Sequence, residues 1–304
     1  MYYFQNQLSF QFSSPPIQRI WRMGNAELFI ARDDRLALGV GTKFRKFFGI
    51  HSTLEKNKIK NVILQGELHS NALSAFAFLF RNFGYRIETI AYARNRERTT
   101  ANSLFVKRNS HSLEVCNSRT EWKEKVGTIH PKKEGIYLVP EYGFSSEASN
   151  SLDILWEGIS FSQFDFLVLD IGSGLTWLSA NRFFQNSIPI LGISVGLPKR
   201  KMISWLEEKK ESLEHTEYKI AEERILEFRN FQGFGSKDIS ILEYCKKFYS
   251  EYQIPVEPIY SGKSLFEIQR RCESGELKGK VLYLHQGGLW NFLDLFLPSK
   301  RKAE

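Results

Sequence analysis

Leu36-Ala-Leu-Gly-Val-Gly-Thr-Lys-Phe-Arg-Lys-Phe-Phe-Gly-Ile50 is the stretch that decides the fold, because a loop with two glycines leads directly into an amphipathic helix. Lys43 and Lys46 lie three residues apart, which places both ammonium groups on one face of the predicted helix. Phenylalanines at helical spacing form the opposite, buried face. Gly39 and Gly41 allow backbone angles closed to other residues, so an anionic ligand can approach the helix start, where unpaired N–H groups favour negative charge.

Taken alone, the same stretch also fits an ordinary surface helix with solvated lysines, because a glycine-rich loop before a lysine is a weak motif. In the functional interpretation, one lysine bonds covalently to a ligand and the other neutralises the phosphate of that ligand. The rest of the chain decides between the two.

The composition indicates a well-packed protein of ordinary size. Its 304 residues suit about two domains, each large enough to bury its own core. The net charge of +8 allows nucleic acid, an anionic membrane or a phosphorylated small molecule as partner. The basic residues are scattered in short clusters rather than gathered in a stripe with interleaved aromatics, so we expect no nucleic-acid partner.

The three cysteines, Cys116, Cys245 and Cys272, are far apart and lack metal-ligand spacing, so we expect neither disulfides nor a metal site. The first residues do not form the pattern of a signal peptide, and no apolar run reaches membrane-spanning length. The sequence therefore predicts a soluble, cytoplasmic protein that does not bind membranes.

Predicted strands alternate with predicted helices along most of the chain. We expect residues 1–26 to be irregular and strands at residues 28–31, 61–65, 87–92, 113–116, 135–140, 164–170, 188–195 and 280–285. We expect helices at residues 70–80, 101–107, 119–125, 150–159, 240–252 and 265–272, with others after residues 42, 176 and 199. Such alternation favours parallel sheets with helices on both faces and a ligand at the carboxyl ends of the strands.

Five loops at these strand ends carry polar and glycine-rich motifs. They are, in chain order, Gly39-Val-Gly-Thr-Lys-Phe-Arg-Lys46, Gly66-Glu-Leu-His-Ser-Asn71, Gly172-Ser-Gly-Leu-Thr176, Glu257-Pro-Ile-Tyr-Ser-Gly-Lys263 and His285-Gln-Gly-Gly288. Their order resembles the G-G-N-K-x-R-K, G-G-x-Q-S-N, G-S-G-G-T, D-P-V-Y-T-G-K and H-T-G-G motifs of one pyridoxal-phosphate enzyme family. This is the 1-aminocyclopropane-1-carboxylate deaminase and D-cysteine desulfhydrase family, whose fold is the tryptophan-synthase-β-like fold type II. The resemblance runs from about residue 16 to the end.

The resemblance implies pyridoxal 5'-phosphate as cofactor and assigns residues to it. Lys43 matches the lysine that forms the Schiff base and carries protons, and Lys46 matches the lysine that holds the phosphate. A lysine suits these roles because its pKa falls readily on burial or beside another cation. The phosphate loop is matched by Gly172, Ser173, Gly174, Leu175 and Thr176, which would offer backbone N–H groups and two hydroxyls. Both hydroxyl residues of this loop equally suit simple helix caps.

Four further residues are assigned by the same comparison. Asn71 matches the asparagine that hydrogen-bonds the cofactor ring oxygen, and Tyr260 matches the tyrosine packed on the ring. Ser70 matches a serine near the substrate carboxylate and reacting carbon. The alternatives are that Ser70 and Asn71 cap a helix and that the tyrosine is ordinary packing. Ser261 matches the partner of the pyridine nitrogen, where a hydroxyl in place of a carboxylate favours β-elimination over cyclopropane cleavage.

Several positions depart from the family pattern, all in or beside the ligand loops. They are Thr42, His69, Ala72, Leu175 and Gln286. His69, which replaces a glutamine, is either a substitute acid or base or a buried, hydrogen-bonded histidine. The phosphate contacts survive these changes better than the substrate contacts.

We therefore predict an α/β protein of two three-layer domains with twisted, mostly parallel sheets and the cofactor in the crevice between them. Residues 1–45 plus 151–304 form the larger, cofactor-binding domain, and residues 46–150 form a smaller α/β domain inserted in it. The predicted activity is that of a lyase or deaminase that acts on a small amino acid and releases ammonia and a 2-oxo acid. A D-cysteine desulfhydrase-like β-elimination is preferred, and a 1-aminocyclopropane-1-carboxylate deaminase-like reaction comes second. The alternative is a relative that binds cofactor or amino acid without turnover. The family also implies a homodimer.

Overall fold

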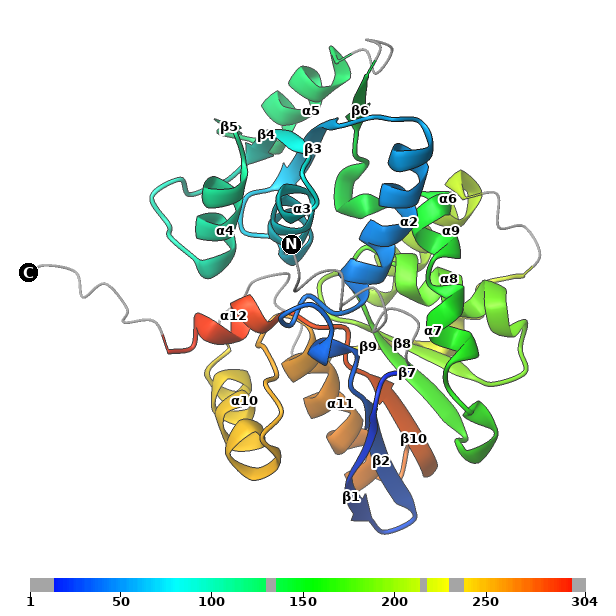
Figure 1. Cartoon of the computed structure of the whole chain (residues 1–304). Helices are drawn as coiled ribbons and strands as arrows, with labels where there is room; N and C mark the ends of the chain where they lie inside the picture. Colours follow the sequence, from blue (N-terminus) through cyan, green and yellow to red (C-terminus); the bar gives the residue numbers. More distant parts are fainter. Residues whose placement is uncertain (1–13, 130–134, 214–217, 230–237, 297–304) are drawn as a thin grey trace, which may run out of the picture.

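The computed structural model describes residues 14–129, 135–213, 218–229 and 238–296, and it contains two sheets with helices packed against them (Figure 1). The larger sheet has the strand order β1-β2-β10-β7-β8-β9. Its strands are β1 (Ile17–Met23), β2 (Ala26–Ala31), β7 (Phe166–Ile171), β8 (Ile190–Ser194), β9 (Ile225–Glu227) and β10 (Gly279–Leu284). The hairpin of β1 and β2 is antiparallel, and every other pairing in this sheet is parallel.

The smaller sheet is entirely parallel, with the order β5-β4-β3-β6. Its strands are β3 (Asn61–Glu67), β4 (Arg86–Tyr92), β5 (Ser112–Cys116) and β6 (Ile136–Leu138). The predicted fold class, α/β with mostly parallel sheets, is confirmed. All four strands lie within the predicted insertion, residues 46–150, although the domain boundaries themselves remain a prediction.

The helices follow the strands along the chain. They are α2 (Thr42–Lys56), α3 (Asn71–Asn82), α4 (Ala101–Asn109), α5 (Arg119–Gly127), α6 (Ser146–Asn150), α7 (Asp153–Glu157), α8 (Leu175–Phe184), α9 (Lys199–Ser212), α10 (Ile239–Tyr252), α11 (Ser261–Glu273) and α12 (Leu289–Leu293).

Both faces of the larger sheet are buried. In β10, Leu282 and Leu284 belong to a core shared with the helices of the smaller sheet, whereas Val281 and Tyr283 belong to a second core with α10 and α11. This alternation follows from the two-residue period of a strand. Because the first core extends into both sheets, one continuous apolar interior joins them.

Three predictions about secondary structure were wrong. Residues 17–23 form edge strand β1 rather than an irregular lead-in; most of its side chains are exposed, so it lacks an apolar signature. The helix predicted at residues 150–159 is replaced by the shorter α7, and a separate helix, α6, ends where the predicted one begins. Helix α11 begins at Ser261, four residues before the predicted start, because the Glu257 carboxylate accepts hydrogen bonds from the backbone N–H groups of Tyr260 and Ser261.

Two further elements, strand β9 and helix α12, form in segments where we predicted neither a strand nor a helix. Residues 1–13 of the predicted irregular lead-in lie outside the described residues.

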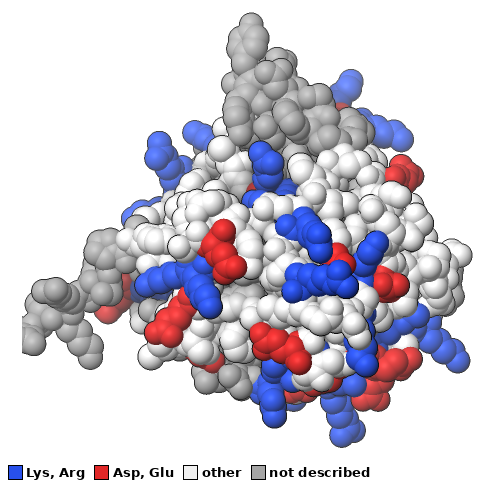
Figure 2. Space-filling view, turned by 90° about the horizontal axis from the view of Figure 1, so that it is seen from below, with Lys and Arg blue, Asp and Glu red and all other residues white. Residues whose placement is uncertain are grey.

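Several surface features bear on the class of partner. Across the described ranges, no helix is long and apolar enough to span a membrane. Cys116, Cys245 and Cys272 are all buried free thiols. On the face shown in Figure 2, basic side chains lie among acidic ones and among wide areas that carry neither charge.

Candidate active site

The start of α2 is fixed against the loop after β10 by close backbone contacts. Gly41 has φ +67°, and a Cβ atom there would lie 2.3 Å from the carbonyl oxygen of Gln286. A Cβ on Gly39 would lie 2.2 Å from the Cβ of Leu289. The N–H of Thr42 donates to the same Gln286 oxygen at 3.3 Å. These glycines therefore let two loops 244 residues apart in sequence meet at one point.

Two lysines lie in the first turns of α2, Lys46 buried and Lys43 of intermediate exposure. Lys46 is only 7% exposed, and within the described ranges it forms no hydrogen bond or ion pair that would neutralise it. Burial, followed by repulsion from Lys43, lowers the pKa of Lys46 to about 7. Burial also lowers the pKa of Lys43, against the opposing attraction of Asp170 and Glu257. A buried cation without a partner is unfavourable unless an anion binds it.

Two buried carboxylates face these lysines, and the sequence analysis did not identify either as a site residue. Asp170 ends the apolar strand β7 and accepts a hydrogen bond from the Tyr283 hydroxyl at 2.8 Å. Burial raises the pKa of both Asp170 and Glu257, and the charge of Lys43 partly opposes this for Asp170. A carboxylate at the end of a central parallel strand was the available signal for Asp170.

The predicted phosphate loop lies between β7 and α8. Gly174 is the N-cap of α8 with φ +93°, and no side chain caps this helix, so its first N–H groups have no side-chain acceptor. Trp205 Nε1 donates to the Ser173 carbonyl at 3.0 Å and fastens the loop to α9. The Leu175 side chain is fully buried, so this residue can offer a ligand only its backbone. Thr176 is buried one residue later.

Tyr260 lies directly against this loop. A Cβ on Gly172 would lie 2.9 Å from Cε1 of the Tyr260 ring, so the ring occupies the space that a side chain at Gly172 would take. The pKa of Tyr260 is raised, chiefly by burial and next by the Glu257 charge. The Ser261 hydroxyl accepts from the Glu257 N–H at 2.8 Å and lies 3.4 Å from the Glu257 carbonyl oxygen. Two predicted site residues from separate motifs, Gly172 and Tyr260, are therefore in contact.

Ser70 and Asn71 lie at the start of α3. The Ser70 hydroxyl accepts from the Leu73 N–H at 3.1 Å, so Ser70 is the helix N-cap, as the alternative interpretation had it. Among the described residues, Ser70 forms no hydrogen bond with Lys43. Asn71 is buried and lies beside Gly288, where an added Cβ would be 3.1 Å from Asn71 Nδ2.

The loop before α3 carries an additional titratable group. Glu67 stands where the family motif has its second glycine, and its Oε2 accepts from the His69 N–H at 2.9 Å. Burial raises the pKa of Glu67 to about 7. The His69 ring bonds the Thr100 hydroxyl at 3.0 Å, and burial lowers its pKa. His69 is therefore a partly buried, hydrogen-bonded histidine, the second of the two interpretations given above.

Departures from the family pattern elsewhere have structural partners. Gln286 Nε2 donates to the Asp170 carbonyl at 2.9 Å, which links the last motif to the end of β7. A separate feature is the buried ion pair between Asp33 and Arg45, whose nitrogen and oxygen lie 2.7 Å apart; Arg45 stands between the two lysines in sequence. Neither residue of this pair was predicted from the sequence to take part in the site.

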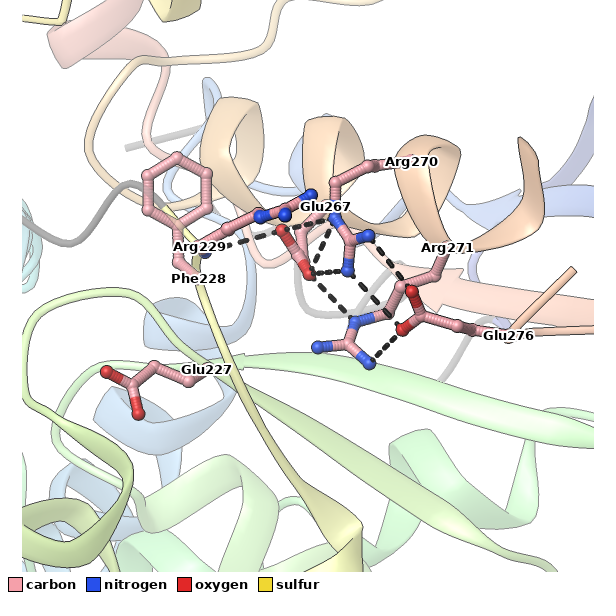
Figure 3. A pocket seen from close by; sticks show the side chains of 7 residues that line it. All are labelled: Glu227, Phe228, Arg229, Glu267, Arg270, Arg271 and Glu276. Atoms are coloured by element: carbon pink, nitrogen blue, oxygen red, sulfur yellow. Dashed lines mark hydrogen bonds and ion pairs between the residues drawn. The ribbon is translucent and has the colours of Figure 1, made fainter. Parts of the chain in front are cut away.

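A pocket of about 310 Å³ lies away from these residues, between the end of β9 and α11 (Figure 3). Buried Glu267 accepts from Arg270 and Arg271, and both arginines also pair with Glu276. The acidic and basic groups in this pocket thus neutralise one another, unlike the two lysines of α2.

The chain resembles known proteins over nearly its full length. No family model matches it. A relative from Thermotoga maritima named "Putative 1-aminocyclopropane-1-carboxylate deaminase" is 25% identical and covers 94% of this chain and 96% of its own. A relative of the same name from Pyrococcus horikoshii is 27% identical and covers 90% of this chain and 89% of its own.

Solved structures share the fold. The crystal structure of an ACC deaminase homologue matches with a TM-score of 0.77 and 22% identity, over 93% of this chain and 94% of that chain. A pyridoxal 5'-phosphate-dependent aspartate racemase matches with a TM-score of 0.67 and 10% identity, over 93% and 92%. Sequence and architecture are thus shared over the region that contains all five motifs.

Proposed function

Starting from the confirmed resemblance to the 1-aminocyclopropane-1-carboxylate deaminase and D-cysteine desulfhydrase family, we propose that the chain is a pyridoxal-phosphate-dependent lyase or deaminase. Its substrate is a small amino acid, and its products are ammonia and a 2-oxo acid. The observation that carries the proposal is the pair of lysines on α2, of which Lys46 is buried without a neutralising partner in the described part of the chain.

The residues present fit the cofactor. Lys46 and the uncapped start of α8 offer positive charge and N–H groups to a phosphate. Tyr260, packed on Gly172, supplies an aromatic wall beside that phosphate site. When bound, pyridoxal phosphate draws electrons from the substrate and so permits loss of a proton and a leaving group.

The side chains of this protein would then bind, orient and move protons. The lowered pKa of Lys43 favours the neutral amine, which can attack an aldehyde and accept a proton. The Asn71 amide would hold the ring oxygen of the cofactor, and the hydroxyl of Ser261 would lie at the pyridine nitrogen. A hydroxyl does not keep that nitrogen protonated, so loss of a β-substituent, as from D-cysteine, is preferred to cyclopropane opening.

Reduction with borohydride tests covalent attachment to Lys43. We expect protein loaded with pyridoxal phosphate and then reduced to carry the cofactor on the peptide that contains Lys43, and we expect the Lys43→Ala variant to carry none. Labelling of another lysine, or of none, would reject the assignment.

A panel of D- and L-amino acids with 1-aminocyclopropane-1-carboxylate, assayed for ammonia and 2-oxo acid, tests turnover separately. Labelling at Lys43 without any product would favour the alternative, a protein that binds the cofactor without catalysis. The substitution of a glycine by Glu67 in the substrate loop is the observation behind this alternative.

We propose a homodimer on the basis of the family. Leu104 on α4 and Leu293 and Phe296 at and after α12 are large, exposed apolar side chains, and α4 and α12 contact each other. Such side chains are typical of surfaces covered by another subunit. Sedimentation equilibrium that gives a mass near twice 35.4 kDa would support the dimer, and the monomer mass at high protein concentration would exclude it.

A further inference from the structure

Four buried polar side chains form a hydrogen-bonded chain between the two sheets. They are Asn71 on α3, Asn102 on α4, Asn291 on α12 and Glu257 before α11, and each is less than a tenth exposed. Asn102 Nδ2 lies 3.0 Å from Asn71 Oδ1 and 2.6 Å from Asn291 Oδ1. Asn291 Nδ2 lies 3.2 Å from Glu257 Oε2. Asn102 and Asn291 thus connect a residue of the Ser-Asn motif to a residue of the Tyr260 motif.

The surroundings of Asn102 fix the orientation of its amide. Besides the two amide oxygens, its Nδ2 meets the His69 carbonyl oxygen at 2.9 Å, while its Oδ1 accepts from the Ser74 hydroxyl at 2.8 Å. The two hydrogens of this NH2 group are shared among three acceptors, and one of these, the His69 backbone carbonyl, can only accept; a flipped amide would turn its oxygen toward that carbonyl and lose the hydrogen bond. The donor of Asn102 therefore points at Asn71.

This orientation in turn fixes Asn71. With Oδ1 of Asn71 held by Asn102, the Nδ2 group faces the other way, and in the described part of the chain it has no hydrogen-bond partner. A Cβ on Gly288 would lie 3.1 Å from both Asn71 Nδ2 and Glu257 Cγ, so these two groups flank the same space beside Gly288. Asn71 consequently presents a donor, not an acceptor, at the junction of the two sheets.

At the other end of this hydrogen-bonded chain, Glu257 fixes the backbone at Tyr260. The Glu257 carboxylate accepts from the N–H groups of Ile259, Tyr260 and Ser261 at 2.7 to 3.0 Å and so sets the first turn of α11. Asn291 donates to the same carboxylate.

Helix α12, which carries Asn291, is itself packed against α4, a helix of the smaller sheet. The Trp290 ring stacks on Phe105 of α4 at a centroid distance of 3.9 Å. The Ala101 N–H at the start of α4 donates to Asp294 at 2.8 Å. In Figure 1, α12 lies between α4 above and α10 below. The polar chain therefore lies behind a packed apolar contact, where water is excluded and its hydrogen bonds are strengthened.

We propose that Asn102 and Asn291 are positioning residues of the active site. They fix the position of the Asn71 donor relative to the turn at Tyr260 that Glu257 caps. Asn71 begins α3, which packs on the smaller sheet, whereas Tyr260 precedes α11, which packs on the larger sheet. The proposal rests on the proposed function, since its consequence is that Asn71 donates a hydrogen bond to the ring oxygen of pyridoxal phosphate. Neither residue touches the cofactor in this arrangement.

The test is an Asn102→Asp variant, which keeps the shape but replaces the donor by an acceptor and so turns the Asn71 amide around. We expect the variant to bind pyridoxal phosphate about five- to tenfold more weakly, the loss of about one hydrogen bond. We expect the pH midpoint of the visible absorbance of the bound cofactor to shift in the same direction as in Asn71→Ala. The double variant should bind no more weakly than Asn71→Ala, because both changes remove one interaction.

Asn109→Asp is the matched control. Asn109 lies on the same helix and is buried, and among the described residues its side chain donates only to the Phe105 carbonyl of its own helix. We expect it to lower the midpoint of urea unfolding without moving cofactor affinity or the absorbance midpoint.

The proposal is overturned if Asn102→Asp behaves like Asn109→Asp, or if the losses of Asn102→Asp and Asn71→Ala multiply in the double variant. Wild-type protein that binds no cofactor would overturn the proposed function and this inference together.

Discussion

Binding of a phosphate ester should make the protein take up a proton at Lys46. The pKa of Lys46 is lowered to about 7 by burial and by Lys43. At pH 8, about nine-tenths of this amine is therefore neutral before the ligand arrives, and at pH 7 about half is neutral. A phosphate dianion beside the amine favours the charged form and raises its pKa. We expect uptake of about 0.9 proton per site at pH 8 and about 0.5 at pH 7.

Isothermal titration calorimetry in two buffers with different ionisation enthalpies measures this number directly. Pyridoxine 5'-phosphate is the suitable ligand, because it carries the phosphate but no aldehyde that would react with Lys43. In the Lys46→Met variant, uptake should disappear and affinity should fall about 10- to 150-fold, the loss of a charge-assisted hydrogen bond.

Two results would refute this reasoning. Equal proton uptake in wild type and Lys46→Met would assign the proton to another group. Absence of uptake at pH 8 in the wild type would mean that Lys46 is already charged and that burial does not lower its pKa.

The same pKa has a consequence for stability. Between pH 7 and about 10, the unfolded chain binds a proton at Lys46 that the folded chain does not. The free energy of unfolding of the wild type, relative to Lys46→Met, should therefore decrease as the pH falls, by at most about 1.4 kcal/mol per pH unit.

Two further substitutions test the support around the site. Asp33→Asn removes the carboxylate that pairs with the buried Arg45, so we expect the free energy of unfolding in urea to decrease by about 3–5 kcal/mol; a change below 1 kcal/mol would contradict the buried pairing. Gly172→Ala places a methyl group 2.9 Å from the Tyr260 ring, so we expect weaker cofactor binding in fluorescence titrations. Its control, Gly127→Ala, adds a methyl group with nothing within 4 Å and should leave binding unchanged.

The parts of the fold that could be predicted from the sequence are those with a local signal. The apolar runs of β3, β7 and β8 are buried on both faces, and a continuous run of apolar residues is typical of such strands. Ser70 was predicted to cap α3 and does so. The strand β1 could not be predicted in this way, because this exposed edge strand has neither a continuous nor an alternating apolar pattern.

The proposed site residues also differ in whether a local sequence pattern marks them. Lys43 and Lys46 could be predicted as site residues because they share one helix and one motif, but Asn102 and Asn291 are 189 residues apart and neither stands in a recognisable pattern. Their roles depend on which amide oxygen faces which donor, and this follows from packing between α4 and α12. A single sequence contains no periodicity that reports such a contact.

The charges around Lys43 and Lys46 are the reason why we propose a phosphate ligand there. Burial lowers the pKa of Lys43 and Lys46 and raises the pKa of Asp170 and Glu257, so it disfavours the charged form of all four groups. Repulsion between the two lysines adds to this cost for Lys46. A bound phosphate lowers the cost of charging Lys46, while a neutral Lys43 keeps the lone pair that an aldehyde requires. Burial lowers the pKa of both lysines, so the proposed division of roles between them rests on their positions in the motif.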